Sequence, residues 1–88
     1  MKKVKVAVNG YGVIGKRVAD AVQLQEDMEL VGVCDIISDW RIRIALQKEF
    51  PIYAFDSKFQ QEMAGNNIEV KGILSELIKM SDIIVDCT

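Results

Sequence analysis

The chain has 88 residues, of which half are hydrophobic and 27% are charged, and its formal net charge is -2. This composition is typical of one small folded domain and not of a disordered segment. A slightly acidic chain without a basic stripe is not expected to bind nucleic acid. No apolar run approaches the ~20 residues that span a bilayer, and no signal peptide pattern is visible, so we expect a cytoplasmic protein without a membrane partner.

The cysteine and histidine counts restrict the chemistry further. The chain has two cysteines, Cys34 and Cys87, each within a hydrophobic segment, and it has no histidine. We interpret both cysteines as reduced, buried strand residues. Without histidine or a close cysteine pair we expect no metal site, and nucleophilic triads that need histidine are excluded.

The first part of the chain reads as strand, helix, strand. Residues 4–8, VKVAV, are apolar enough for a strand that is covered on both faces. Apolar positions then recur at helical spacing from Val13 to about residue 25, and residues 30–34, LVGVC, form a second apolar run that ends at Asp35. This order predicts one βαβ unit with a right-handed crossover.

The remaining elements continue the alternation. In chain order we predict a helix over 39–49, a short strand or extended connection over 51–55, a short helix over 57–64, a weak strand over 68–70, a helix within 72–80 and a strand over 83–87. Asp39 and Ser57 are the expected N-caps of two of these helices. In the helix within 72–80 we expect Leu77 and Ile78 to face inward.

This alternation predicts an α/β fold, a Rossmann-type parallel sheet with helices on both faces. The strand over 83–87 is as apolar as a central strand, yet the chain stops at Thr88, before anything covers its other side. We therefore expect an incomplete sheet, the first part of a larger domain.

Three glycines follow the first strand in VAVNGYGVIGKR, at Gly10, Gly12 and Gly15. The spacing G-x-G-x-x-G is weak evidence alone, because glycines also gather at ordinary turns. With a strand before it and a helix after it, the pattern predicts a dinucleotide site. Gly10 then permits the tight turn, Gly12 lets the backbone approach a pyrophosphate, and Gly15 lets the helix pack closely. The N–H groups near Val13, Ile14 and Gly15 are expected to face the phosphates.

The second half of that pattern is an acidic residue at the end of the second strand. Asp35 lies 20 residues after Gly15, the spacing expected of a carboxylate that binds the adenosine ribose and repels a 2′-phosphate. The alternative is a plain turn with an unrelated loop aspartate. Arg41 and Arg43 lie close enough in sequence to approach a 2′-phosphate, although a surface role is the favoured interpretation for both.

The stretches VAVNGYGVIGKRVADAV, DMELVGV and SDIIVDCT closely resemble the N-terminal segment of archaeal-type glyceraldehyde-3-phosphate dehydrogenases. The resemblance implies that residues 1–88 are the N-terminal part of an NAD(P)-binding Rossmann domain, with the catalytic domain absent from this chain. It also implies oxidative phosphorylation of glyceraldehyde 3-phosphate, in glycolysis or gluconeogenesis, by a homo-oligomer that is a tetramer in the family.

The resemblance also assigns residues. The family's dinucleotide contacts fall on Gly10, Gly12, Val13, Ile14 and Gly15. Many relatives carry a hydroxyl residue in place of Val13, so a side-chain contact to phosphate is missing here. Relatives often have a lysine just after the second strand, suited to NADP, whereas this chain has CDI at 34–36, which favours NAD while leaving NADP possible.

The resemblance assigns no catalytic residue to this chain. The family's nucleophile is a cysteine in an S-C-N-T type segment, and neither Cys34 nor Cys87 matches it, so the chain alone is not expected to be catalytic. Two alternatives remain open. One is the NAD(P)-binding segment of another aldehyde or semialdehyde dehydrogenase or of a reductase, and the other is a stand-alone nucleotide-binding module.

Overall fold

Strands and helices alternate along the chain in the computed structural model, which describes residues 3–35 and 40–88. In chain order the elements are β1 (Val4–Asn9), α1 (Val13–Gln23), β2 (Met28–Asp35), α2 (Trp40–Gln47), β3 (Ile52–Ala54), α3 (Ser57–Gly65), β4 (Gly72–Ile73), α4 (Leu74–Met80) and β5 (Ile83–Asp86). Within the described residues the strands form a five-stranded sheet, and every strand pair in it is parallel.

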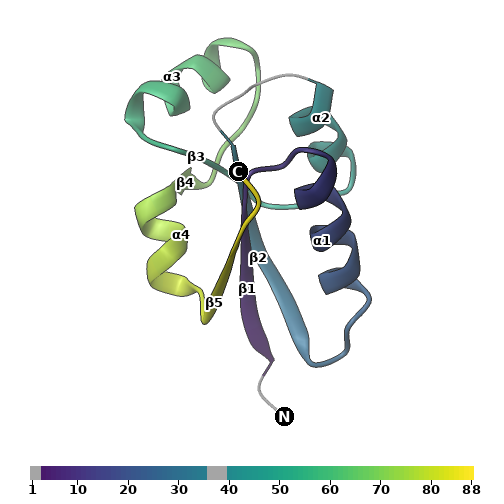
Figure 1. The fold of residues 1–88 in the computed structure, drawn as a ribbon. Helices are drawn as coiled ribbons and strands as arrows, with labels where there is room; N and C mark the ends of the chain where they lie inside the picture. The colour runs from purple at the N-terminus through teal and green to yellow at the C-terminus, as the bar shows by residue number, and fades with distance from the viewer. Residues whose placement is uncertain (1–2, 36–39) are drawn as a thin grey trace.

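The order of the strands in the sheet is β4-β3-β2-β1-β5. The chain therefore moves outward from β1 through β2 and β3 to β4 and then returns to place β5 on the other side of β1 (Figure 1). β2 and β5 thus pair with opposite edges of β1, and the order in which strands are added reverses there. In doubly wound sheets, ligands bind in the crevice that opens at such a reversal, outside the carboxyl ends of the strands.

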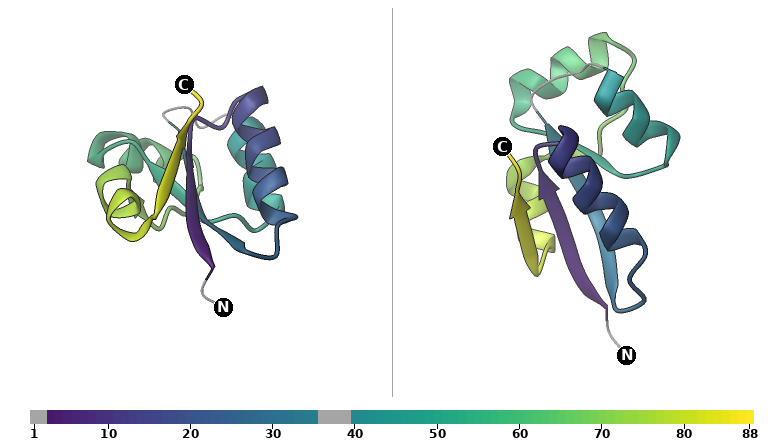
Figure 2. Two further views of the ribbon diagram at one scale, coloured as in Figure 1. Left: turned by 60° about the horizontal axis from the view of Figure 1, so that its bottom comes forward. Right: turned by 45° about the vertical axis from the view of Figure 1, so that its right-hand side comes forward.

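Helices cover both faces of the sheet, and the apolar side chains of β1 point alternately to one face and the other. Val6 and Val8 enter one hydrophobic cluster with side chains of α1, α2 and α3, and Ala7 enters a second cluster with Leu77 of α4. All four side chains are at most 3% exposed. Figures 1 and 2 show α1 and α2 on one face and α4 on the opposite face. The predicted α/β class with a Rossmann-type parallel sheet is confirmed.

The strand predicted over residues 68–70 is wrong. The backbone N–H of Ile68 donates to the Met63 carbonyl at the end of α3, so this residue continues the helix end instead of joining the sheet. Pairing with β3 begins only where the N–H of Lys71 donates to the Ile52 carbonyl, just before β4. Ile68 is 1% exposed, so the apolar pattern reflected burial of its side chain without strand pairing.

Two details of the predicted helices also need correction. The N-cap of α3 is Asp56 and not Ser57, since the Asp56 carboxylate accepts the N–H of Phe59 at 3.1 Å. Ile78 of α4 does not face inward: 48% of it is exposed, whereas its neighbour Leu77 is fully buried. The predicted cap Asp39 lies outside the described residues.

The β5 edge of the sheet is apolar and open. Within the described residues β5 pairs with β1 alone, and Ile83 and Ile84 are 49% and 37% exposed.

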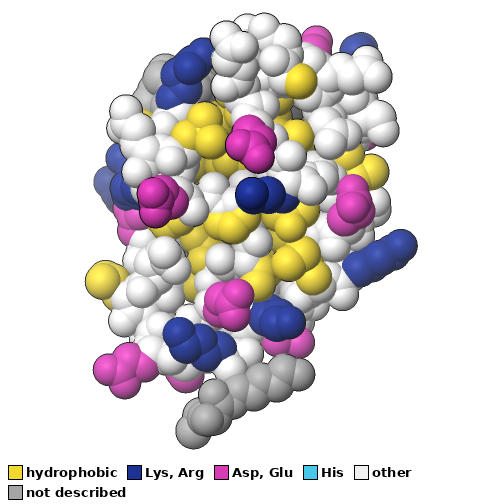
Figure 3. Space-filling model, turned by 180° about the vertical axis from the view of Figure 1, so that it is seen from behind, with side chains coloured by type: hydrophobic (Ala, Val, Ile, Leu, Met, Phe, Trp, Pro, Cys, Tyr) yellow, Lys and Arg dark blue, Asp and Glu magenta, His cyan; other side chains and the backbone are white. Residues whose placement is uncertain are grey.

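On the surface opposite to the view of Figure 1, hydrophobic side chains gather in the middle and charged side chains of both signs are scattered among and around them (Figure 3). None of the helices in 3–35 and 40–88 has the length and apolar character needed to cross a membrane.

Candidate functional site

The glycine turn joins β1 to α1 at the carboxyl end of the sheet. Gly10 has φ +97°, a conformation that residues with a side chain rarely adopt. Its N–H donates to the Cys34 carbonyl at 2.7 Å, which fixes the turn to the end of β2. A β-carbon at residue 10 would stand 3.0 Å from backbone atoms of Cys87 and Thr88, so the turn also lies close to the chain that follows β5.

Gly15 and Gly12 serve the turn in different ways. A β-carbon on Gly15 would stand 1.8 Å from the Gly10 carbonyl oxygen, so α1 can pack against the turn only if residue 15 has no side chain. Gly12 is the N-cap of α1, and its carbonyl accepts the N–H of Lys16 at 2.9 Å. The φ of Gly12 is -84°, which any residue can adopt, so its conformation does not itself require glycine.

The N-terminus of α1 has the properties of an anion site. No side chain caps it, and its first turn contains no acidic residue. Val13 and Ile14 are 63% and 61% exposed, so the first turn of the helix is open to solvent. The first N–H groups of a helix have no partner within it, and the helix dipole favours negative charge at that end.

Asp35 ends β2 beside this turn. One of its carboxylate oxygens, Oδ2, accepts the backbone N–H of Tyr11 at 2.7 Å. The neighbouring Cys34 thiol has its pKa raised to about 12, first by burial and then by the negative charge of Asp35. A thiol with that pKa stays protonated near neutral pH, and the Cys34 side chain is fully buried, so both properties are typical of a structural cysteine.

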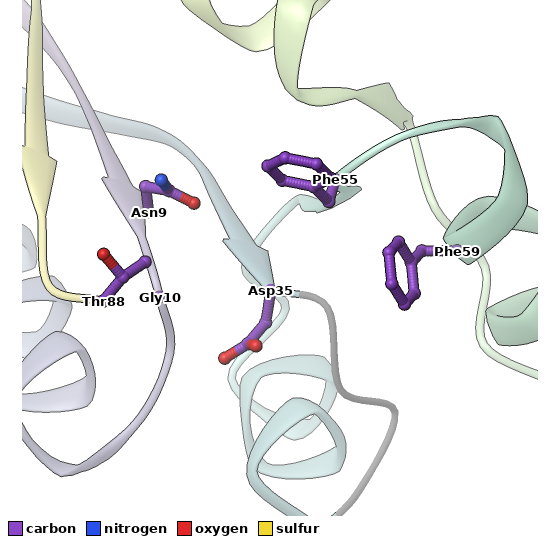
Figure 4. A pocket seen from close by; sticks show the side chains of 6 residues that line it. All are labelled: Asn9, Gly10, Asp35, Phe55, Phe59 and Thr88. Carbon is purple, nitrogen blue, oxygen red and sulfur yellow. The ribbon is translucent and has the colours of Figure 1, made fainter.

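A pocket of about 350 Å³ opens at this end of the sheet (Figure 4). Its lining residues come from the carboxyl ends of β1, β2, β3 and β5 and from α3: Asn9, Gly10, Asp35, Phe55, Phe59 and Thr88. The rings of Phe55 and Phe59 meet edge to face, with their centroids 6.2 Å apart. The pocket therefore combines a carboxylate, the glycine turn and two aromatic rings.

The structure brings together Gly10 and Asp35, which the sequence pattern singled out, but it adds four lining residues that the pattern missed. Asn9 ends β1, Phe55 directly follows β3 and Thr88 lies two residues after β5, whereas Phe59 lies one helical turn after the Asp56 cap. The carboxyl ends of parallel strands meet at one edge of a sheet. The residues at the carboxyl ends of the predicted strands, either the last residue or the one after it, were thus the signal that could have identified the first three.

Two other candidate residues do not join the pocket lining. The Arg43 guanidinium is exposed and donates to the Asn66 carbonyl at 3.4 Å, which agrees with a surface role. The side chain of Arg41 lies outside the described residues. The prediction that Cys87 is a buried strand residue is wrong: β5 ends at Asp86, and Cys87 directly follows it as a half-buried residue that packs against the larger hydrophobic cluster.

Tyr11 anchors the glycine turn in the protein core. Its side chain is fully buried, and its ring meets the Phe50 ring edge to face with centroids 6.4 Å apart. The hydroxyl has no hydrogen-bond partner within the described part of the chain. Burial, followed by the charge of Asp20, raises the pKa of this hydroxyl to about 12.

Curated proteins similar to this chain are archaeal glyceraldehyde-3-phosphate dehydrogenases. The chain is 48% identical over 88 residues to that of Methanococcoides burtonii and 46% identical over 88 residues to that of Archaeoglobus fulgidus, matching 100% of the chain and 26% of each relative. It is 48% identical over 86 residues to that of Pyrobaculum islandicum, covering 97% of the chain and 24% of the relative. No protein-family profile matches the chain. The whole chain is thus similar to archaeal glyceraldehyde-3-phosphate dehydrogenases, and it spans about a quarter of the length of each of them. The resemblance to that family is confirmed.

Proposed function

We propose that residues 1–88 are the N-terminal part of the NAD(P)-binding domain of a glyceraldehyde-3-phosphate dehydrogenase. One observation carries the proposal: the glycine turn and Asp35 meet at one pocket, beside the reversal of strand order between β1 and β5. The names of the similar proteins supply the activity of the whole enzyme, which would oxidise and phosphorylate glyceraldehyde 3-phosphate. The chain spans only about a quarter of those proteins, so the catalytic domain would be a separate part.

The pyrophosphate of the cofactor would bind at the start of α1. The N–H groups of Val13, Ile14 and Gly15 belong to the uncapped first turn, where an anion is favoured. Gly12 would let the phosphates approach the backbone, which explains a glycine at a position whose φ does not need one. The missing side chain at Gly15 keeps this helix end against the turn. The residues present therefore fit the group.

The adenosine part would bind in the pocket beside Asp35. A volume of about 350 Å³ lies at the lower end of the range of small-molecule pockets, so it suits part of a dinucleotide. Phe55 and Phe59 would supply apolar contact area for the adenine. A carboxylate offers about four acceptor positions, so Asp35 can hold the N–H of Tyr11 together with a ribose hydroxyl. Its charge would oppose a 2′-phosphate, which favours NAD over NADP.

The chain's own residues would bind and orient the cofactor and would not carry out catalysis. A nicotinamide dinucleotide supplies the hydride acceptor when it is bound. The chain has no histidine to act as a base, and the Cys34 thiol has a pKa of about 12, so we assign no catalytic residue within it. By analogy with the family we propose a homo-oligomer, with glyceraldehyde 3-phosphate as a partner of the whole enzyme only.

The test is a calorimetric titration of the protein, as its source produces it, with NAD and with NADP. We expect saturable binding of both, tighter for NAD, and its loss in a Gly12→Val variant whose side chain would occupy the phosphate position. An unchanged affinity in that variant would contradict the assignment of the turn. A protein that binds the cofactors but does not oxidise glyceraldehyde 3-phosphate would favour the alternative of a nucleotide-binding module or of another dehydrogenase.

A further inference from the structure

A hydrogen bond connects the end of β2 to the glycine turn through a side chain. Oδ2 of Asp35 lies 2.7 Å from the backbone nitrogen of Tyr11, 24 residues earlier in the chain. Tyr11 stands between Gly10 and Gly12, and α1 begins directly after Gly12. The carboxylate is thus bonded to the backbone that leads into the first turn of α1.

The other contacts of the turn hold the Gly10 backbone and the Tyr11 ring, not the Tyr11 backbone. The Gly10 N–H is held by the Cys34 carbonyl at 2.7 Å, and the Tyr11 ring is fully buried against Phe50. Neither contact satisfies the Tyr11 N–H, which lies in a part-buried position and bonds to Asp35. A part-buried backbone N–H that loses its acceptor is costly, so the turn would have to move if the carboxylate were removed.

We propose that Asp35 is a positioning residue for the glycine turn, in addition to any contact that it makes with ribose. This inference rests on the proposed function. One carboxylate then connects the adenosine part of the site to the pyrophosphate part. Replacing it by an apolar residue to admit NADP would therefore weaken pyrophosphate binding for NAD and NADP alike, because the N–H groups at the start of α1 would no longer be held in place.

Inorganic pyrophosphate separates the two roles, because it has no ribose. The matched variants are Asp35→Asn, which keeps an oxygen that can accept the Tyr11 N–H, and Asp35→Ala, which does not. Both remove the same negative charge, so a general electrostatic effect on an anion cancels between them. Glu29→Ala, at the opposite and exposed end of β2, is the control for loss of a carboxylate from this strand.

In calorimetric titrations with sodium pyrophosphate we expect Asp35→Ala to bind roughly tenfold more weakly than Asp35→Asn, the effect of losing about one hydrogen bond. Asp35→Asn is expected to bind pyrophosphate at least as well as the wild type, and Glu29→Ala is expected to bind like the wild type. Equal pyrophosphate affinities in the Asn and Ala variants would overturn the positioning role, even if both variants bind NAD more weakly.

Amide hydrogen exchange of Tyr11 in the protein without ligand gives a second readout. We expect a protected Tyr11 amide in the wild type and in Asp35→Asn, and exchange at least about tenfold faster in Asp35→Ala. If the Ala variant does not fold, a wild-type Tyr11 amide that exchanges as fast as an unbonded one still overturns the inference. A wild type that binds neither NAD nor NADP would instead contradict the proposed function, and the exchange experiment would remain decisive for the hydrogen bond.

Discussion

Gly15 and the carbonyl of Gly10 approach so closely that a β-carbon on residue 15 would overlap the carbonyl oxygen, at 1.8 Å. The two glycines are five positions apart, one in the turn and one in the first helical turn that follows. Because the obstacle is backbone and not a flexible side chain, it cannot move aside alone. The position of α1 relative to the ends of β1 and β2 therefore depends on a single missing methyl group.

Gly15→Ala is accordingly expected to lower the free energy of unfolding by about 1–3 kcal/mol or more, as overpacking does, and to weaken NAD binding. Gly65→Ala is a matched control, because a β-carbon at this last residue of α3 meets nothing within 4 Å. That change is expected to be neutral or to stabilise by about 0.4–1 kcal/mol. Urea denaturation measures both. Equal midpoints for the two variants would contradict the close approach.

Cofactor preference provides a second prediction. A hydrogen bond to a charged group contributes roughly 1.5–3 kcal/mol, so Asp35→Ala should weaken NAD binding by about 10- to 150-fold. The difference between NAD and NADP should narrow or reverse, because the like charge that opposes the 2′-phosphate is gone. Paired calorimetric titrations of the wild type and the variant measure both affinities. If the two cofactors bind equally well and the substitution changes neither affinity, Asp35 is not part of the site.

The stability of the protein is expected to depend on pH in the alkaline range. The pKa of Cys34 rises from 9.0 to about 12 on folding, and that of Tyr11 from 10.0 to about 12. A raised pKa contributes stability that is complete below the unfolded value and is lost as the pH rises through the folded value. The free energy of unfolding should therefore fall between about pH 9 and pH 12.

The double variant Cys34→Ala, Tyr11→Phe tests this assignment. Its free energy of unfolding should fall less steeply over that range than that of the wild type, as measured by urea denaturation at several pH values. At neutral pH, Tyr11→Phe alone is expected to stabilise by about 1–2 kcal/mol, because it removes a buried hydroxyl that has no partner within the described residues. A wild type and a double variant with the same alkaline slope would refute the assignment.

Association through β5 is the fourth expectation. Ile83 and Ile84 are exposed on a strand that pairs on one side only within the described residues, and such an edge invites pairing with another chain. The 88-residue chain should form dimers or larger assemblies in sedimentation experiments. Ile84→Lys should shift it toward monomer, whereas Leu24→Lys, at an 81% exposed position outside the sheet, should not. A compact wild-type monomer at high concentration would count against the prediction.

The fifth prediction concerns activity. The 88-residue chain, supplied with glyceraldehyde 3-phosphate, phosphate and NAD, should form no NADH above the blank, because burial keeps the Cys34 thiol protonated, Cys87 does not lie in a segment of the S-C-N-T type, and the chain has no histidine base. Absorbance of NADH measures this directly. Turnover that disappears on Cys87→Ser would contradict both the prediction and the interpretation of Cys87 as a residue without a catalytic role.

The local sequence predicted most of the elements, because strong patterns bear on them. The runs in β1 and β2 are mostly apolar, and the structure covers both faces of these strands. The pattern was misleading at Ile68, whose burial depends on the end of α3, and at Ile78, which helical spacing alone placed inward. Both depend on which backbone groups and elements lie against these residues in the fold, about which a hydrophobic pattern carries no information.

The same distinction applies to the candidate site. Gly10 and Asp35 belong to a spacing rule, and the structure places both on one pocket. Phe55 and Phe59 follow no such rule, since their position depends on where β3 ends and on how α3 begins at Asp56. The bond between Asp35 and the Tyr11 N–H also depends on three-dimensional arrangement, because two residues 24 positions apart carry no local sign of a hydrogen bond.

The place of β1 in the sheet has a consequence for how the molecule is built during synthesis. β1 is the first strand of the described chain, yet one of its two edges is paired only by β5, the last strand of the described chain. Closing the loop between them brings Lys5 to Asp82, 77 residues later: the Lys5 N–H donates to the Asp82 carboxylate at 2.8 Å, and the Asp82 N–H donates to the Lys5 carbonyl at 2.8 Å. Closing such a distance costs chain entropy before any contact rewards it. A growing chain therefore carries a half-paired β1 until β5 has been synthesised, which is the interval in which chaperones would meet it.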